Sequence, residues 1–385
     1  MSQSQIHKTK YHSWCTGRIA KGCSLCVKGR KLVLFITGIC AQKCFYCPIS
    51  EKKFGIDITY ANEWQISNPE NPIELFREAQ ITEAKGAGIT GGDPLAKIER
   101  CCKYISQLKK KFGKSFHIHL YTPLKLVTKE KLTKLYNAGL DEIRFHPDLD
   151  DNTLWQRINL AKKFSWDIGV EIPAIPGYEQ KTKKLIDYLI DKIDFINLNE
   201  LELSDTKIPH YELSTRRFMQ KDSISYGVKG SKEMALRMLR YAKSKGLNAY
   251  FCTAKLKDSV QVGERIKLRA KHSALSFDTI TKEGLLIRGC VYIHELKPSS
   301  GYREQLKQAN KKTVIKKLAN TKAMLNRELS ISKESLVIDE KKLRIILPAK
   351  ILREKSDAIK SLGLIPAIVE EYPTDDAIEI DVEFL

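Results

Sequence analysis

Apolar, strand-like runs alternate with amphipathic helical patterns through residues 31–255, and no other feature restricts the fold as strongly. The predicted strands cover residues 31–36, 86–90, 116–121, 142–145, 167–172, 195–199 and 247–251. Helical patterns fill the intervals, at residues 73–85, 98–112, 129–138, 151–164, 181–192 and 231–245. This βα repetition predicts an α/β fold with a parallel sheet and right-handed crossovers. About six such units are fewer than the eight that close a barrel.

The first predicted strand is followed at once by three cysteines, Cys40, Cys44 and Cys47, with the spacing C-x3-C-x2-C. Three thiolates on a short loop can hold three irons of a cubane iron–sulfur cluster and leave the fourth iron without a protein ligand. A small molecule can chelate that open iron. The alternatives are a zinc knuckle or three unrelated buried thiols, but zinc usually takes paired C-x2-C ligands and a fourth donor. The spacing therefore favours a cluster with one open iron.

The same loop, with Tyr46 before its last cysteine, resembles the signature of the radical S-adenosylmethionine (SAM) superfamily. The turn Gly91-Gly92-Asp93-Pro94 after the second strand is similar to the Gly-Gly-Glu-Pro turn of that family. The resemblance implies an open, partial (β/α)6 barrel with its active site at the C-terminal strand ends. It also implies an enzyme that binds a 4Fe–4S cluster and cleaves SAM reductively. The resulting 5′-deoxyadenosyl radical would abstract hydrogen from a substrate, with a ferredoxin- or flavodoxin-type donor supplying the electron.

The resemblance also indicates which residues contact SAM. Tyr46 is expected beside the adenine, and Gly91 and Gly92 let backbone carbonyls approach the ammonium group because no Cβ intrudes. Asp93 stands where the family has Glu, which shortens the side chain by one methylene. Polar residues at later strand ends are further candidates for SAM or substrate contacts: Thr122, Arg144, Glu171 and Asn199. For each of these the alternative is a capped strand end or a salt bridge.

A second cysteine group, Cys15, Cys23 and Cys26, precedes the first strand. A C-x2-C pair with a third cysteine upstream has the spacing of a zinc knuckle or of an auxiliary iron–sulfur site, and the sequence does not separate the two. Three free thiols are the alternative. Either centre needs a fourth ligand, for which the candidates are Cys252, Cys290 and His12. Such a centre would staple the N-terminal segment across the barrel and shape a basic rim at the mouth of the active site.

The formal net charge of +20 is unevenly distributed. Residues 1–53 hold ten Lys and Arg against one acidic residue, and residues 229–327 hold 23 against 7. This concentration indicates contact with a polyanion such as nucleic acid, although a lysine-rich solvated helix would give the same pattern. Three functions stay open. They are a radical SAM enzyme acting on RNA such as tRNA, a glycyl-radical-enzyme activase acting on a protein, and a non-catalytic zinc-dependent RNA-binding protein.

Composition divides the chain into an N-terminal metal-binding segment (1–30), a radical SAM core (31–255), a basic, mostly helical segment (256–330) and a small α+β domain (331–385). No apolar stretch reaches the roughly 20 residues of a membrane span, and no signal-peptide core is visible. A cytoplasmic location is therefore expected, where ten cysteines indicate metal binding or catalysis rather than disulfides. The runs 29–38, 44–48, 251–258 and 370–374 further resemble archaeal radical SAM proteins related to the pyruvate formate-lyase activating enzyme.

Overall fold

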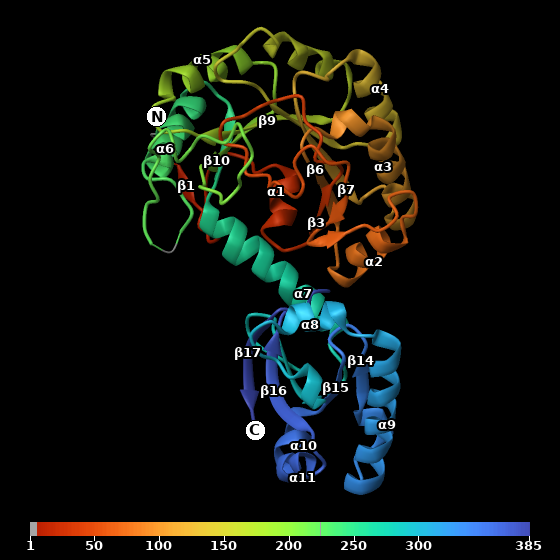
Figure 1. The fold of residues 1–385 in the computed structure, drawn as a ribbon. Helices are drawn as coiled ribbons and strands as arrows, with labels where there is room; N and C mark the ends of the chain where they lie inside the picture. Colours follow the sequence, from red (N-terminus) through yellow and green to blue (C-terminus); the bar gives the residue numbers. More distant parts are fainter. Residues whose placement is uncertain (1–5, 224) are drawn as a thin grey trace. The chain divides into compact units, whose positions relative to one another are not determined.

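A computed structural model describes residues 6–223 and 225–385 of the chain (Figure 1). The chain forms two compact units, Met1–Arg265 and Ile266–Leu385, and helix α7 (Gly263–Ser273) crosses the boundary between them. The first unit contains the whole βα repetition. In the described part of the chain, no helix combines the length and the apolar character that crossing a membrane requires.

The first unit is built on an 11-stranded sheet whose central strands run parallel. Its order is β1-β2-β11-β10-β9-β8-β7-β6-β3-β4-β5, and all neighbours from β11 to β3 pair in parallel. The strands are β1 (His7–Lys8), β2 (Trp14–Thr16), β3 (Lys31–Phe35), β4 (Tyr60–Ala61), β5 (Trp64–Gln65), β6 (Gly86–Thr90), β7 (His117–Pro123), β8 (Glu142–His146), β9 (Asp167–Ala174), β10 (Phe195–Glu200) and β11 (Asn248–Cys252). The expected α/β partial-barrel fold is confirmed.

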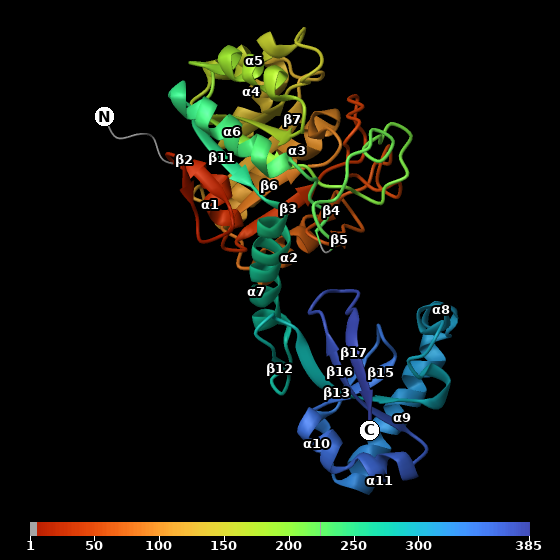
Figure 2. The same ribbon diagram turned by 90° about the vertical axis from the view of Figure 1, so that its left-hand side faces the viewer.

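Helices cover the outer face of this curved sheet, and Figure 2 shows α6 running alongside β11. They are α2 (Ile73–Ile81), α3 (Ile98–Phe112), α4 (Lys129–Ala138), the 3-10 helix η2 (Trp155–Lys163), α5 (Glu179–Leu189) and α6 (Ser231–Ser244). Alternation along β7 separates the two faces of the sheet. Ile118 and Leu120 join the apolar core under the helices, so His117, His119 and Tyr121 face the interior of the half barrel. The inner face is therefore polar.

A short helix, α1 (Lys21–Cys26), lies inside the ring of strands (Figure 1). It contacts β3, β6 and β7. Gly86 on β6 contributes to the room for it, because an added Cβ would lie 3.0 Å from Leu25 Cδ1 as well as 2.2 Å from the carbonyl oxygen of His117 on β7. The backbone N–H of Gly22 donates to Oε2 of Glu142, at the start of β8, over 3.3 Å. Helix α1 therefore closes the half barrel at the N-terminal end of its strands.

The second unit has its own 6-stranded antiparallel sheet, in the order β14-β15-β13-β16-β17 with β12 beside β13. Its strands are β12 (Thr279–Ile280), β13 (Leu286–Tyr292), β14 (Val337–Asp339), β15 (Arg344–Leu347), β16 (Ile365–Glu371) and β17 (Glu379–Phe384). Its helices are α8 (Tyr302–Gln308), α9 (Lys311–Leu329), α10 (Ala349–Glu354) and α11 (Ser356–Ser361). An apolar core lies between α9, α10, α11 and the sheet.

The observed strand pairing gives domain boundaries that differ from those expected from composition. Strand β13 comes from the segment 256–330, yet it pairs with β15 and β16 of the segment 331–385. Main-chain hydrogen bonds thus unite the two segments in one unit, while residues 256–265 remain with the first. Residues 6–30 of the expected N-terminal segment also join the first unit, because β2 pairs with β11 and α1 lies inside the barrel.

Candidate active site

The three cysteines of the loop after β3 open onto one cavity of about 410 Å³. The cavity lies at the C-terminal ends of β3 and of β6 to β10, where a parallel sheet of this type places its chemistry. Its lining consists of Phe35, Cys40, Gln42, Cys44, Tyr46, Cys47, Pro48, Ile49, Thr90, Gly91, Gly92, Tyr121, Thr122, Pro123, His146, Glu171 and Asn199. The volume is in the range of small-molecule sites, about 300–1,000 Å³. Most of the residues predicted for SAM are thus brought together here.

The cluster loop is folded so that its thiols converge on the cavity. The backbone N–H of Gln42 donates to Cys40 Sγ over 3.3 Å, and that of Cys47 donates to the carbonyl of Cys44 over 3.0 Å. Burial raises the pKa of Cys40 to about 11 and that of Cys44 to about 12, and it also raises the pKa of Cys47. Iron must therefore displace protons from these thiols when it binds. Three converging thiols fit a cubane cluster with one open iron.

Gly91 and Gly92 pack directly against the backbone of the cluster loop. An added Cβ would lie 2.5 Å from the carbonyl oxygen of Thr37 at Gly91, where φ is +148°, and 2.5 Å from that of Ile39 at Gly92. The turn is held there by two hydrogen bonds, from Gly92 N–H to Thr37 and from Asp93 N–H to Ile39, both of 2.8 Å. These glycines therefore serve the contact between two backbone segments, while the close approach of SAM expected from the sequence stays a prediction.

The side chain of Asp93 lies behind the cavity wall and does not line it. Its Oδ1 accepts from the backbone N–H of Leu95 over 3.0 Å and from the hydroxyl of Thr122 over 2.9 Å. The carboxyl is fully buried, so its pKa is raised to about 6. Asp93 thus caps the 3-10 helix η1 (Pro94–Lys97) and positions Thr122, which does reach the cavity.

Tyr46 and His146 form a hydrogen-bonded pair on the cavity wall. Tyr46 Oη is 2.9 Å from His146 Nε2, and His146 Nδ1 is 2.7 Å from the carbonyl oxygen of Glu171. Because a carbonyl only accepts, Nδ1 carries the proton and Nε2 accepts from the phenol. Burial lowers the pKa of His146, in agreement with a neutral ring. The pair holds the Tyr46 ring in one orientation.

Glu171 presents a carboxylate to the cavity that three side chains hold in place. Its Oε2 accepts from Arg144 Nη1 over 2.8 Å and from Asn197 Nδ2 over 2.9 Å, and its Oε1 accepts from Asn199 Nδ2 over 2.9 Å. Arg144 is 2% exposed and does not line the cavity. It also pairs with Glu142. Glu171 and Asn199 therefore reach the predicted site, whereas Arg144 supports Glu171 from within the barrel.

The N-terminal cysteines lie in the barrel interior. Cys15, Cys23 and Cys252 belong to one buried packing cluster, and Cys26 is on the same helix as Cys23. Helix α1 closes the N-terminal end of the strands, so these residues do not form the expected rim at the mouth of the cavity. Cys290 is fully buried in the core of the second unit, which removes it as a fourth ligand.

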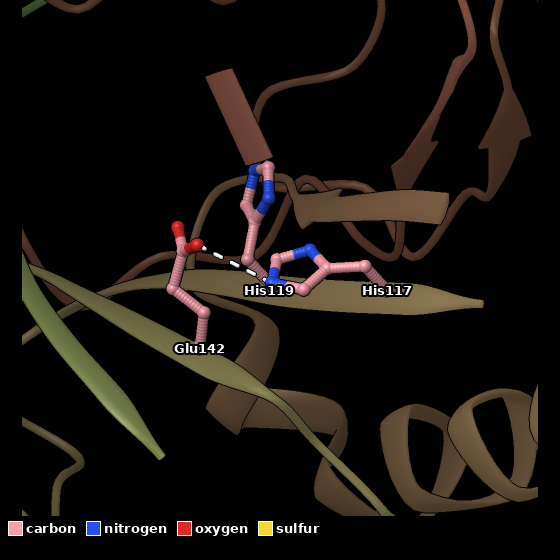
Figure 3. Close-up of side chains that lie close together, drawn as sticks. All are labelled: His117, His119 and Glu142. Atoms are coloured by element: carbon pink, nitrogen blue, oxygen red, sulfur yellow. Dashed lines mark ion pairs between the residues drawn. The ribbon is translucent and has the colours of Figure 1, made fainter. Parts of the chain in front are cut away.

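Sequence reasoning missed a buried trio beneath the site, His117, His119 and Glu142 (Figure 3). In the described residues, only this trio brings three candidate ligand atoms within 4.8 Å of one another. His117 Nε2 is 3.4 Å from Glu142 Oε2, and Lys31 Nζ is 3.2 Å from His117 Nδ1. Burial lowers the pKa of His117 to about 3. The neutral ring therefore accepts from Lys31 and donates to Glu142, an interior hydrogen-bond network. Its sequence signal was the His-x-His spacing on a strand, which puts both rings on one face.

Comparison with known proteins agrees with this geometry. The model of the Radical SAM superfamily matches residues 34–198. A Methanocaldococcus jannaschii protein with the provisional name of glycyl-radical enzyme activating enzyme is 44% identical over 281 residues, which cover 71% of this chain and 73% of that protein.

Among solved structures, methylornithine synthase aligns with 60% of this chain and 76% of its own, at 13% identity and a TM-score of 0.36. Coproporphyrinogen III oxidase from Escherichia coli aligns with 59% of this chain and 57% of its own, at 10% identity and a TM-score of 0.34.

Family membership implies a 4Fe–4S cluster and SAM, for which the three thiols and the cavity are suited. The expectation of an enzyme is confirmed, and a non-catalytic zinc-dependent RNA-binding protein is not supported. The chain belongs to the radical SAM superfamily and is a relative of the glycyl-radical enzyme activating enzymes.

Proposed function

We propose that this radical SAM enzyme abstracts hydrogen from a partner protein, as an activase of a glycyl-radical enzyme does. The observation that carries the proposal is the 44% identity with the M. jannaschii protein, which extends over 73% of that relative and bears that name. The position of the cavity is compatible with it, since a site at the C-terminal strand ends can admit a segment of another chain.

RNA, such as tRNA, is the second candidate, and the clusters of Lys and Arg at residues 1–53 and 229–327 favour it. The second cluster is divided, however, because the boundary between the two units falls at residues 265 and 266. It is therefore weaker support for one continuous nucleic-acid surface than the sequence suggested. A protein substrate is preferred for this reason.

The residues of the cavity take the following roles in the proposal. Cys40, Cys44 and Cys47 would hold the cluster, which when reduced would pass one electron to SAM and release methionine and a 5′-deoxyadenosyl radical. Tyr46, held by His146, would pack beside the adenine. Gly91 and Gly92 would lie at the methionine end of SAM, and the polar cavity residues Thr122, Glu171 and Asn199 would contact SAM or the substrate. With SAM bound, the residues that line the cavity would limit the access of water to the radical chemistry.

Three further expectations belong to the proposal. The electron comes from a ferredoxin- or flavodoxin-type donor, because the cluster must be reduced before SAM is cleaved. The enzyme works in the cytoplasm. The cysteines of the N-terminal segment, Cys15, Cys23 and Cys26, hold a second metal centre, for which their common position in the barrel interior is the support.

The test separates a protein substrate from RNA. The reconstituted enzyme is incubated anaerobically with SAM, dithionite and a cell extract, and 5′-deoxyadenosine release is measured above the rate without extract. If the substrate is a protein, treating the extract with RNase before the assay leaves this stimulation intact, and treating the extract with protease abolishes it. A glycyl radical should also appear by electron paramagnetic resonance (EPR). If RNase treatment of the extract abolishes the stimulation and protease treatment does not, the substrate is RNA and not a protein. The variant Cys40→Ala/Cys44→Ala/Cys47→Ala is the control and should release no 5′-deoxyadenosine.

A further inference from the structure

A second cavity, of about 590 Å³, adjoins the SAM cavity. It lies between the cluster loop and the segment that follows β10, and the π-helix η3 (Leu256–Val262) adds Asp258 to its lining. Pro48 lines both cavities, and near the end of β10 Asn199 lines the SAM cavity while Glu202 lines the second one. We call this second cavity the outer groove. A molecule bound there is a neighbour of whatever occupies the SAM cavity.

Hydrogen bonds hold the wall of the outer groove against the cluster loop. The hydroxyl of Thr206, in the groove lining, donates to the carbonyl of Ile49 over 2.6 Å. Within the wall, the backbone N–H of Leu203 donates to the carbonyl of Tyr226 over 2.8 Å. Ile49 also lines the SAM cavity. The groove is therefore built onto the same loop that carries the candidate cluster ligands.

Carboxylates dominate the lining of the outer groove. In the part of the chain that the structure describes, this lining contains Glu51, Glu202, Asp205 and Asp258 against a single basic residue, Lys52. The whole chain carries a formal net charge of +20, so an acidic groove is the reverse of its general character. The phosphates of a nucleic acid would be repelled here, whereas a positively charged group would be attracted.

Two of these carboxylates are available to a ligand. Asp205 and Asp258 are exposed, and neither forms an ion pair within residues 6–223 and 225–385. Glu202, by contrast, pairs with Lys257. Partial burial and then repulsion from Glu202 raise the pKa of Asp258, so these two carboxylates lie close together. A cation bound beside them would relieve the repulsion.

Tyr226 adds an aromatic surface to the carboxylates. It is 51% exposed and lines the outer groove, as do the apolar side chains of Leu203 and Pro48. Aromatic rings attract the cationic groups of Lys and Arg, whose aliphatic stems pack on apolar surface. Carboxylates beside an exposed ring and apolar groups thus suit a Lys or Arg side chain of a polypeptide better than a small inorganic cation.

We propose that the outer groove docks a Lys- or Arg-bearing segment of the partner protein, beside the segment that enters the SAM cavity. The proposal rests on the proposed protein substrate and adds the charge by which that partner is recognised. Because Pro48 lines both cavities, a chain anchored in the groove brings its neighbouring residues to the SAM cavity. Exposed charges of this kind select the partner and speed its encounter with the enzyme.

The experiment measures the binding of a fluorescein-labelled lysine octapeptide to the reconstituted enzyme by fluorescence anisotropy. The groove variant is Asp205→Lys/Asp258→Lys, at two positions outside the lining of the SAM cavity. Its dissociation constant for the peptide should be about tenfold above that of the unaltered chain. Added salt should weaken binding to the unaltered chain. Circular dichroism and iron per chain check that each variant is folded and assembled. If the charge reversal does not fold, Asp205→Asn/Asp258→Asn should still raise the dissociation constant about threefold.

A matched control reverses two carboxylates away from the outer groove. Glu130→Lys/Glu233→Lys lies on α4 and α6, which cover the outer face of the sheet, and it changes the net charge by the same amount. This control should bind the peptide as the unaltered chain does. Absence of binding to the unaltered chain would overturn the proposal, as would equal binding by the groove variant and the control.

The extract assay then separates the outer groove from the proposed function. The lysine octapeptide should suppress the stimulation of 5′-deoxyadenosine release, and the groove variant should need about tenfold more extract than the unaltered chain. Stimulation that survives RNase and is the same in the groove variant would reject the groove and leave the proposed function intact. Stimulation that is lost with RNase would reject the proposed function, and the docking proposal with it.

Discussion

Replacing Gly92 by Ala tests how the glycine turn supports the cluster loop. Gly92 has no positive φ, so alanine brings no backbone strain of its own. The added Cβ would lie 2.5 Å from the carbonyl oxygen of Ile39 and 2.8 Å from that of Gly38. Both obstacles are backbone atoms, which cannot rotate away as a side chain can. The turn and the loop must therefore separate by a few tenths of an ångström or more.

The cost follows from the contacts that this movement breaks. Two backbone hydrogen bonds join the segments, Gly92 to Thr37 and Asp93 to Ile39. Each contributes about 1 kcal/mol net, and forcing a methyl group into a packed site costs about 1–3 kcal/mol. If both bonds are lost, the unit that holds the loop should thus lose roughly 3–5 kcal/mol of unfolding free energy. Displaced thiols should also hold less iron, because the loop starts directly after Ile39.

The assay compares Gly92→Ala with Gly263→Ala, where an added Cβ meets nothing within 4 Å and φ is not positive. Both variants are reconstituted anaerobically, and iron per chain and the denaturation midpoint are measured. Gly92→Ala should lose iron and stability, whereas Gly263→Ala should match the unaltered chain. If Gly92→Ala keeps its iron and its midpoint and weakens only SAM binding, the glycine serves SAM alone and the argument is refuted.

Three further changes probe other contacts. Gly22→Ala puts a Cβ 2.4 Å from His119 Nδ1, so it should displace α1 and cost about 1–3 kcal/mol of unfolding free energy; an unchanged denaturation midpoint would contradict this. Asp93→Asn should raise the unfolding free energy at pH 8 but not below pH 4. The pKa of Asp93 is about 6 in the folded chain, above the unfolded value of about 3.9, so the native chain loses at most about 3 kcal/mol of stability as pH rises through that window. Asn removes this loss, although its unpaired amide would offset part of the gain in stability. Equal gains at both pH values, measured by urea titration, would exclude this cause. Tyr46→Phe removes the 2.9 Å hydrogen bond to His146, which is worth about 1 kcal/mol. The SAM dissociation constant, measured by anaerobic dialysis, should therefore rise less than about tenfold. A far larger rise would mean that the Tyr46 hydroxyl contacts SAM directly.

The sequence by itself determined the local features of this protein. The βα alternation predicted the parallel strands, because burial on both faces and the two periodicities are properties of short segments. The spacing of Cys40, Cys44 and Cys47 predicted the cluster loop, since all three candidate ligands come from one loop. The cavity at the strand ends followed, because parallel strands bring their C-terminal ends to one edge.

Only the tertiary structure decided which side chains meet across the barrel. Nothing local in the segment around Cys23 shows that α1 enters the barrel, since the space for it is made by glycine on β6, more than 60 residues later along the printed sequence. Asp93 has the position of the family's glutamate, yet its partners Leu95 and Thr122 hold it behind the wall. Contacts of this kind depend on packing between distant segments, where a shift of one residue in register changes the neighbours. The sequence therefore specified the chemistry of the site, and the folded chain specified which groups support it.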